Sequence, residues 1–467
     1  MTFVEEEIDR SMDTFTAAAR GIGQRLDALP VSSFHYKIIL VLAAGTFFEL
    51  YEVFLTGILS TTLKAEFKVA GPALSLILAS SLIGAFLGAA LVAPLADRIG
   101  RRNAFMVTVA TYSVFTLVAA FSPNETVLVI ARFLAGVGMG GEIPVVSAFF
   151  VDLLPPKQRG RLTAIAFTVA YTAAPVVGFL SFTLAPASPL GVAGWRWVFA
   201  LGALGAVAAA LMRRGLPESP RWLASVGRID EADRIVADFE RQARVAQGRP
   251  PVQTDAPSVP APARADLKSV VRPPFRRRFL LLSASWGVVV IGWSGFGTLA
   301  ALSLESRGFA TTGTLLFVSL TFLGYPLGSL LSIPLLDRFE RKWIVAVSIA
   351  VMGALGASFG LSTSSVGIVV AGFTYTLVSN VLSNALNAYT FEQFPTNIRA
   401  SACGWIFSLG RLSAALSPFY LVAALSAWGP SATFIGIACV MALISAGVVA
   451  FGIRTTGYSV EKITRST

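Results

Sequence analysis

Long apolar runs separated by short polar loops dominate the chain. A helix that crosses the hydrocarbon core of a bilayer needs about 17 to 25 mostly apolar residues. Twelve runs reach this length, so the pattern predicts an all-α membrane protein with twelve transmembrane helices. The runs are residues 37–61, 74–96, 104–121, 126–153, 161–186, 196–212, 278–302, 312–335, 343–361, 365–392, 400–425 and 430–453.

A long polar stretch divides the twelve predicted spans into two sets of six. Its residues 221–244 have the charge spacing of a helix that lies along the membrane surface, and residues 250–265 are rich in Pro and Ala, as flexible linkers are. The predicted organisation is an N-terminal cytoplasmic segment at 1–36, a six-helix bundle at 37–212, a cytoplasmic linker at 213–277, a second six-helix bundle at 278–453 and a cytoplasmic tail at 454–467.

Composition agrees with a membrane protein, because 55% of the residues are hydrophobic and 13% are charged, against roughly 25% charged in soluble domains. The net charge of +11 could indicate nucleic acid binding. The positive residues, however, cluster in short loops, which is a topology signal, so we expect no nucleic acid partner. Cys403 and Cys439 lack a CxxC partner and His35 has no companion ligand, so we expect no disulfide, metal site or other cofactor.

The loops on one side of the predicted membrane carry most of the arginines, and positive residues are retained in the cytoplasm. Both termini are therefore expected inside, in a multi-pass protein of the inner membrane. The arginine and lysine residues after spans 2, 4, 6, 8 and 10 are Arg98, Arg101, Arg102, Lys157, Arg159, Arg161, Arg213, Arg214, Arg338, Arg341, Lys342 and Arg399, whereas the opposite loops hold Lys64, Lys68, Arg196 and Arg307.

The two halves repeat one another at an offset of 240 residues. The segment 97–102 aligns with 337–342, and residues 152–159 align with 392–399. Duplicated halves of this kind predict a central cavity and a rocking, alternating-access motion.

Acids and arginines that recur at the predicted helix ends can pair in one arrangement of the halves and separate in the other, as a conformational latch. The alternative is that these charges only set topology, although that rule explains the arginines and not the acids. The candidate latch residues are Asp97, Arg98, Arg101, Arg102, Asp152, Arg159, Asp337, Arg338, Arg341, Glu392 and Arg399.

Four ionisable residues lie at membrane depth in predicted spans 1 and 4, namely Glu49, Glu52, Arg132 and Glu142. Such residues are functional candidates, because their burial is costly. A carboxylate among apolar groups takes up a proton more readily than one in water, and a neighbouring arginine opposes this uptake. We therefore expect the three carboxylates and Arg132 to couple transport to protons. A static Arg–Glu pair that joins helices 1 and 4 is the alternative, and the two roles can coexist.

Arg411 lies near the middle of predicted span 11. A lone guanidinium in an apolar cavity favours an anionic ligand, and arginine binds a carboxylate through two parallel hydrogen bonds. The sequence therefore predicts a small organic anion as substrate. The alternative is that Arg411 pairs with Glu49 or Glu52 across the halves and contacts no substrate.

Aromatic and amide side chains complete a candidate pocket. Trp286 and Trp293 are seven residues apart on one predicted helix, so they share a face. Rings of this kind can contact a planar ligand, and amides its polar edge, although the same residues also serve helix packing. The other candidate substrate-binding residues are Asn380, Asn384, Asn387, Tyr171 and Tyr325.

Four motifs carry a resemblance to a known family. The loop 97–102, Asp-Arg-x-Gly-Arg-Arg, resembles the signature between helices 2 and 3 of the major facilitator superfamily, and residues 132–141 resemble its helix 4 motif. Pro217–Leu223 resembles the motif after helix 6 of sugar porters. Residues 389–399 resemble the end of helix 10 in organic ion transporters, synaptic vesicle glycoprotein 2 and bacterial niacin transporters.

The resemblance implies twelve helices in two pseudo-symmetric halves, and a role in proton coupling for Arg132. Arg411 stands seven residues before Pro418, at the position where the resembling anion carriers have a base and cation carriers an acid.

These observations favour a secondary active transporter, a monomer that imports a small organic anion by proton symport. An aromatic monocarboxylate such as nicotinate or benzoate fits one arginine and several rings. A sugar or polyol porter and a drug efflux pump remain alternatives, the first because of the motif at 217–221. A membrane enzyme or sensor is disfavoured, because no Walker motif, metal cluster or nucleophile arrangement is present.

The predicted topology is testable by labelling. A cysteine at Ser258, in a background that lacks Cys403 and Cys439, is expected to resist membrane-impermeant thiol reagents in whole cells, because the linker is predicted to be cytoplasmic. Labelling in intact cells would show that the linker faces outward and would contradict the predicted orientation. Labelling after permeabilisation is the positive control.

Overall fold

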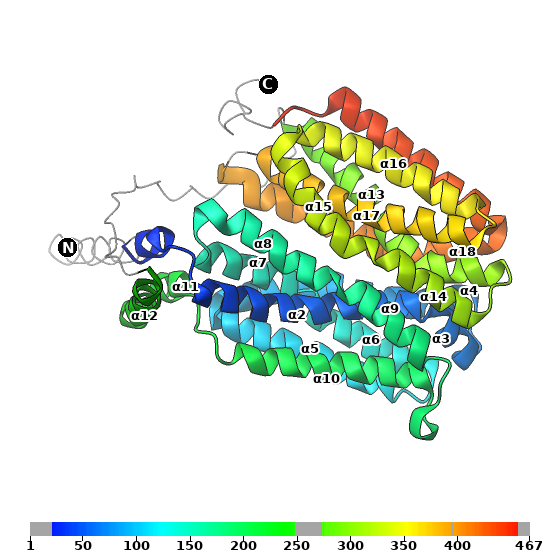
Figure 1. The fold of residues 1–467 in the computed structure, drawn as a ribbon, viewed down its shortest axis with the longest axis horizontal. Helices are drawn as coiled ribbons and strands as arrows, with labels where there is room; N and C mark the ends of the chain where they lie inside the picture. Colours follow the sequence, from blue (N-terminus) through cyan, green and yellow to red (C-terminus); the bar gives the residue numbers. More distant parts are fainter. Residues whose placement is uncertain (1–20, 248–272, 274, 395, 456–467) are drawn as a thin grey trace, which may run out of the picture.

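The computed structural model of the protein describes residues 21–247, 273, 275–394 and 396–455, and its regular elements are helices (Figure 1). The first set of helices comprises α2 (Ser33–Ile58), α3 (Ser60–Phe67), α4 (Gly71–Ile99), α5 (Arg101–Ala120), α6 (Glu125–Met139), α7 (Glu142–Leu153), α8 (Pro156–Tyr171), α9 (Ala173–Leu184) and α10 (Gly194–Arg213). The remainder are α11 (Pro220–Ser225), α12 (Ile229–Gln247), α13 (Phe275–Ser306), α14 (Thr311–Phe322), α15 (Gly324–Arg338), α16 (Arg341–Leu361), α17 (Ser365–Glu392) and α18 (Thr396–Phe451).

The predicted spans correspond to helices, but not always one to one. Predicted spans 4, 5 and 8 each consist of two helices that meet at a short break, and spans 11 and 12 both lie in α18, which is interrupted at Gly429, where φ is 75°. Nine helical segments in the described ranges are long and apolar enough to cross a membrane, and Ala402–Phe451, with 50 residues, covers two predicted crossings. The number of twelve spans and the side of the termini stay predictions.

The internal repeat is visible in the backbone. Helices α4 and α14 begin at residues 71 and 311, α5 and α16 at 101 and 341, and α6 and α17 at 125 and 365, so each pair is 240 residues apart.

Close helix contacts repeat at the same offset. Two equivalent pairs of glycines, one pair in each set of helices, lie so near a backbone carbonyl that an added Cβ would overlap its oxygen, and small residues are what lets membrane helices approach closely. Each pair of glycines therefore fastens one helix to its neighbour in an equivalent way. The contacts are Gly84 with Phe133, Gly88 with Val137, Gly324 with Phe373 and Gly328 with Leu377.

Helices α2–α10 and α13–α18 form two sets that lie side by side (Figure 1). They meet along α4 with α18, along α8 and α9 with α15 and α14, and along α2 with α13. Arg411 of α18 meets Gly140, between α6 and α7, across the boundary of the two sets, and the candidate site lies there.

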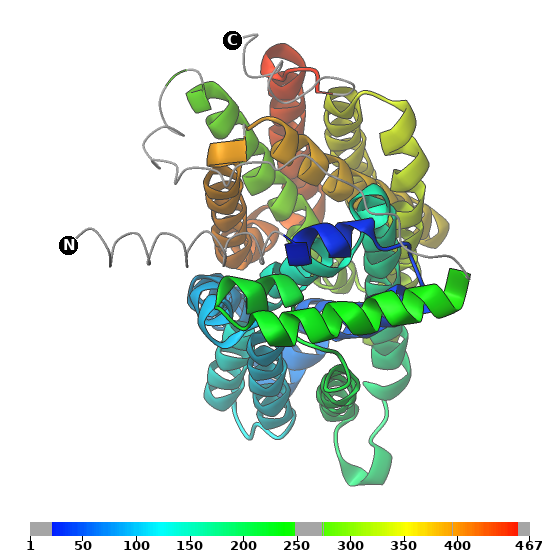
Figure 2. The same ribbon diagram turned by 90° about the vertical axis from the view of Figure 1, so that its left-hand side faces the viewer.

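A helical cap covers one end of the first set (Figure 2). It consists of the helical residues 21–28 together with α11 and α12. Arg25 bonds to Asp233 and, at 2.8 Å, to Glu240, and the hydrogen bonds to Glu240 and Asp233 raise the pKa of the Arg25 guanidinium. The Phe239 ring lies 4.3 Å from that of Phe34. The charge spacing at 221–244 thus corresponds to two packed helices.

Candidate functional site

Glu52 and Arg132 form an ion pair inside the first set of helices. Arg132 Nη1 donates to Glu52 Oε2, and Arg132 Nη2 donates to the Glu52 backbone oxygen at 3.1 Å. Both residues have an exposed fraction of 0%, and the guanidinium lies 5.5 Å from the Phe199 ring centre. A buried charge without a partner is strongly destabilising, so this pair joins α2 to α6.

A second group of buried polar side chains lacks such direct pairing. The side chains of Glu142, Arg213 and Tyr112 are all buried. Among the described residues, no hydrogen bond is made by the two carboxylate oxygens of Glu142, the three guanidinium nitrogens of Arg213 or the hydroxyl of Tyr112. Glu49, buried on α2, adjoins this group, because its charge interacts with that of Glu142. Gly45 makes room for Glu142, since an added Cβ would stand 3.0 Å from Glu142 Oε1.

Arg411 reaches from the second set of helices into the first. Its Nη1 donates to the backbone oxygen of Gly140 at 3.2 Å, at the junction between α6 and α7. The guanidinium is partly buried, and its charge interacts with that of Glu49. Arg411 is therefore a cation at the boundary between the two sets, within the electrostatic reach of one candidate proton carrier.

An aromatic cluster lies beside these charges, on the side of α3. Phe54 of α2 contacts Trp293 and Tyr325, with ring centres 5.3 and 5.1 Å apart, and Tyr171 stacks on Tyr325 at 6.1 Å. Phe54 follows Glu49 by five residues, little more than one helical turn. The cluster joins the two sets, and an ion pair between Lys64 and Glu305, 3.1 Å long, joins them farther along.

The other predicted pocket residues bond within the second set. Trp286 Nε1 donates to Thr390 Oγ1 at 3.0 Å, the Asn380 amide donates to the Tyr325 backbone oxygen at 2.6 Å, and the Asn384 amide donates to Ser332 Oγ at 2.7 Å. Asn387 is exposed. These bonds are packing interactions of the kind expected between membrane helices, and a substrate role for these four residues stays a prediction.

The helix ends that carry the candidate latch are held within each set. In the first, Ser219 Oγ donates to Asp152 Oδ2 at 2.7 Å, and the Arg102 backbone N–H donates to Glu218 Oε1 at 3.0 Å. In the second, Arg341 Nε lies 2.8 Å from Glu392 Oε1.

For the remaining latch candidates, the structure gives only the exposure of the side chain or no description of it. Arg98 and Arg338 are exposed and Arg101 is partly buried. The side chains of Asp97, Arg159, Asp337 and Arg399 lie outside the described part of the structure, so their expected pairings are not tested.

The two copies of the loop motif differ for a structural reason. Gly100 has φ 95°, and the carboxylate of Glu218 and the ring of Trp222 fill the space beside it, so a side chain at Gly100 would clash. At the equivalent position Glu340 has φ −63° and accepts a hydrogen bond from the Thr455 backbone N–H at 2.9 Å. The second loop is thus bound to the segment after α18, whereas the first is bound to the segment after α10.

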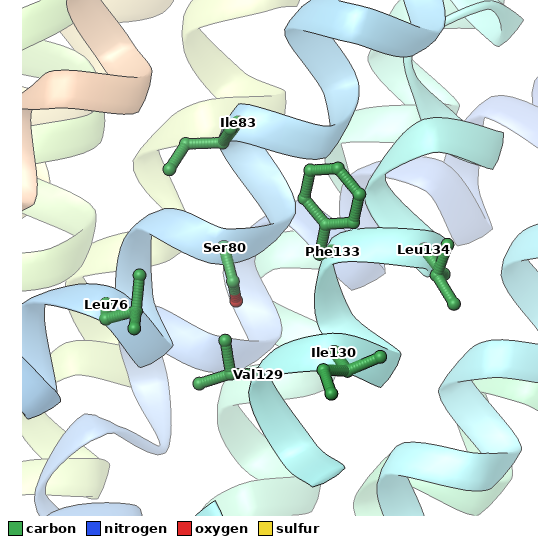
Figure 3. A pocket seen from close by; sticks show the side chains of 7 residues that line it. All are labelled: Leu76, Ser80, Ile83, Val129, Ile130, Phe133 and Leu134. Carbon is green, nitrogen blue, oxygen red and sulfur yellow. The ribbon is translucent and has the colours of Figure 1, made fainter. Parts of the chain in front are cut away.

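A surface pocket between α4 and α6 is separate from these charges (Figure 3). Its lining is apolar except for Ser80, and Leu76 and Ile130 in it are 42% and 54% exposed. An exposed apolar depression on a membrane helix pair suits a lipid chain better than an organic anion, so we do not assign it to transport.

Several residues of the site were not found from the sequence as site residues. The position of Arg213 after predicted span 6 indicates only topology, and Lys64 stands in the sequence only as a residue of the opposite loops. Their burial or pairing depends on helix rotation, for which the sequence carries no signal. Tyr112 and Phe54 are indistinguishable in the sequence from other aromatic residues of apolar runs.

Comparison with known proteins decides the family. Residues 42–418 match the profile of the Major Facilitator Superfamily. The chain belongs to this superfamily. It is 31% identical over 391 residues to the metabolite transport protein YyaJ of Bacillus subtilis, covering 83% of this chain and 86% of the relative. The superfamily assignment, with the apolar helices, makes the protein a multi-pass membrane transporter.

Other relatives in the superfamily have named substrates. The niacin transporter NiaP of Acinetobacter baylyi is 29% identical over 441 residues, with 94% of this chain and 98% of the relative covered. A gallate transporter of Pseudomonas putida is 28% identical over 397 residues, with 83% and 85% covered. The xylose transporter XylE from E. coli, in a partially occluded inward open conformation, superimposes with a TM-score of 0.73 at 18% identity, over 92% of this chain and 100% of that chain.

The Glu52–Arg132 pair predicts a specific loss of stability. Glu52→Gln leaves the Arg132 charge buried without its counter-charge, so the free energy of unfolding should fall by about 3–5 kcal/mol. The measurement is denaturant unfolding of the purified protein in detergent. Glu66→Gln is the control, because Glu66 meets Arg196 at 3.8 Å near the surface, where a pair contributes at most about 1 kcal/mol. Equal losses for the two variants would contradict the structural role of the pair.

Proposed function

We propose that the protein is a secondary active transporter of the inner membrane that imports a small organic anion together with protons. The proposed substrate is an aromatic monocarboxylate, similar in size to nicotinate or benzoate. The observation that carries this proposal is the position of Arg411, a partly buried cation that bridges the two sets of helices at Gly140.

The anion proposal follows from the bonding of Arg411. Among the described residues, Arg411 Nη1 donates to one backbone oxygen, which leaves most of the planar donor face of the guanidinium for a ligand. A carboxylate matches that face through two parallel hydrogen bonds and also neutralises the charge. A neutral ligand would supply hydrogen bonds but no counter-charge, so an anion is the better match.

The aromatic part of the proposal rests on the cluster beside Arg411. Phe54, Trp293, Tyr325 and Tyr171 come from both sets of helices, and the charge of Glu49 interacts with both Arg411 and Tyr171. A ligand that binds Arg411 therefore has rings within reach. The names of two relatives agree with this chemistry, since niacin and gallate are both carboxylated aromatic rings.

Proton coupling is proposed for Glu49 and Glu142. Their carboxylates retain oxygen atoms without a hydrogen-bond donor among the described residues, and a buried carboxylate of this kind is stabilised by a proton. Glu52, in contrast, is paired with Arg132, so we propose that this pair positions α2 and α6 and influences the other two acids.

The wider organisation is proposed in the same terms. Twelve spans, cytoplasmic termini, bundles at 37–212 and 278–453 and a monomeric carrier form a consistent unit. In it, the acids and arginines at the helix ends act as latches that alternate as the bundles rock.

Replacement of Arg411 tests the substrate class. Arg411→Ala should weaken binding of an aromatic carboxylate by about 2–5 kcal/mol, which is roughly thirtyfold or more at 1.4 kcal/mol per tenfold. Arg411→Lys should restore only part of the affinity, because an ammonium lacks the planar fork. Calorimetric titration of the purified protein with nicotinate and with its amide measures the effect.

The amide separates direct contact from damage to the fold, because Arg411→Ala should affect the amide much less than the acid. Arg196→Ala is a matched control, since Arg196 is also a partly buried arginine that donates to backbone oxygens, those of Ala120 and Ser122, away from the site. Equal losses for acid and amide would make Arg411 a structural residue and remove the basis for an anion.

Proton coupling has its own test. In proteoliposomes an inward proton gradient should drive accumulation of the substrate, and Glu49→Gln or Glu142→Gln should abolish accumulation but retain exchange of internal for external substrate. Glu125→Gln, at the exposed start of α6, should behave like the wild type. If accumulation depended on a sodium gradient, or occurred without any ion gradient, Glu49 and Glu142 would be excluded as carriers of a coupled proton.

A further inference from the structure

Arg213 is the last residue of α10 and is completely buried. Its guanidinium carbon lies 3.6 Å from the ring centre of Phe105 and 4.3 Å from that of Phe149. Its Nε, Nη1 and Nη2 atoms have no hydrogen-bond acceptor among the described residues. Aromatic faces attract a cation without using its N–H groups, so this clamp holds the charge and leaves its donors available.

Glu142 lies on one side of this clamp. A Cβ atom added to Gly45 would lie 2.6 Å from Phe105 Cζ and 3.0 Å from Glu142 Oε1. The carboxylate of Glu142 is therefore close to the ring that the Arg213 guanidinium contacts. Both oxygens of Glu142 are buried without a donor among the described side chains. The charges of Glu142 and Arg213 interact. Within the described part of the chain, a buried acid and a buried guanidinium, both without a hydrogen-bond partner, thus lie near the same ring.

Glu218 is the second acid whose charge interacts with Arg213. It belongs to the segment between α10 and α11, and both its oxygens accept hydrogen bonds from the Arg102 backbone N–H, at 3.0 and 3.1 Å. Glu218 therefore caps the start of α5, at the loop that the sequence identifies as a latch. Arg213 has one acid at membrane depth and another at this loop.

We propose that Arg213 is a positioning residue that links the protonation of Glu142 to the Glu218 cap of α5. When Glu142 is ionised, its charge competes with Glu218 for the guanidinium. When Glu142 takes up a proton, that attraction disappears, and the guanidinium acts on Glu218 alone. Proton binding at membrane depth is thereby communicated to the latch loop through one clamped cation.

This inference rests on the uptake of a proton by Glu142, which is part of the proposed function, but not on proton-driven transport or on the identity of the substrate. Other charged or titratable groups also act on this link. Glu49 of α2 interacts with Glu142 and with Arg411 of α18, and Tyr112 of α5 interacts with Glu49 and Glu142. Arg102 of α5 interacts with Arg213.

The pH dependence of thermal stability tests the link without substrate. The full chain is reconstituted in nanodiscs, and its apparent melting temperature is followed from acid to alkaline pH. The wild type should show a transition that Glu142→Gln removes. Arg213→Gln should move the midpoint to higher pH by about one unit or more, because an acid that loses a neighbouring cation holds its proton more strongly.

Two variants separate charge from packing. Arg213→Lys keeps the charge and should leave the midpoint near that of the wild type, and Arg214→Gln, an exposed arginine one residue further, should leave it unchanged. If Arg213→Gln does not yield folded protein, Phe149→Leu removes one face of the clamp and should shift the midpoint in the same direction by a smaller amount. An unchanged midpoint in the folded variant would overturn the inference.

A mutant cycle tests the connection to the loop. The effects of Glu142→Gln and Glu218→Gln on the melting temperature should be non-additive in the wild type and additive in the Arg213→Gln background. Additivity in both backgrounds would reject the link. If the midpoint and the cycle behave as expected but no proton gradient drives uptake, the proposed transport function fails while the link stands.

Discussion

A charge buried at membrane depth needs a partner of opposite sign, and Glu52 and Arg132 supply this partner to each other. Both side chains are inaccessible to solvent, and Arg132 also binds the backbone of Glu52. Loss of either partner would leave an uncompensated charge in a medium that solvates it poorly. The pair therefore sets the rotation of α2 against α6. Once that rotation is set, Gly45 and Glu49 of the same helix face Glu142, and the rest of the site follows.

Within the described ranges, the other central charges lack such a direct counter-ion, and the division of roles that we propose follows this difference. Glu142 and Arg213 interact without a hydrogen bond to either among the described residues, and Arg411 donates to one backbone oxygen. A charge in direct contact with a counter-ion gains little from a ligand, whereas an acid without that contact can be stabilised by a proton and an arginine without it by an anion. Structural and transport charges can thus lie within a few helical turns of one another.

Side-chain contacts join the two sets of helices at several places. On the side of α3, the aromatic cluster and the pair of Lys64 and Glu305 join the sets. At the arginine-rich end, the described bonds of Asp152 and of Glu392 stay within a set. Repeated glycine contacts keep neighbouring helices of each set close. A rocking motion would therefore exchange contacts between the sets while it preserved those within them.

The helical membrane fold and the repeat at 240 residues could be predicted from the sequence, because run length and residue type are local properties. The pairings of the charged residues could not be predicted and are seen only in the folded chain. Arg132 binds Glu52 across 80 residues of chain, Arg213 is buried near Glu142 although its position in the sequence indicates a loop residue, and Lys64 meets Glu305 across 241 residues. Such partners depend on how each helix is rotated and where distant helices touch, and both are set by packing against neighbours.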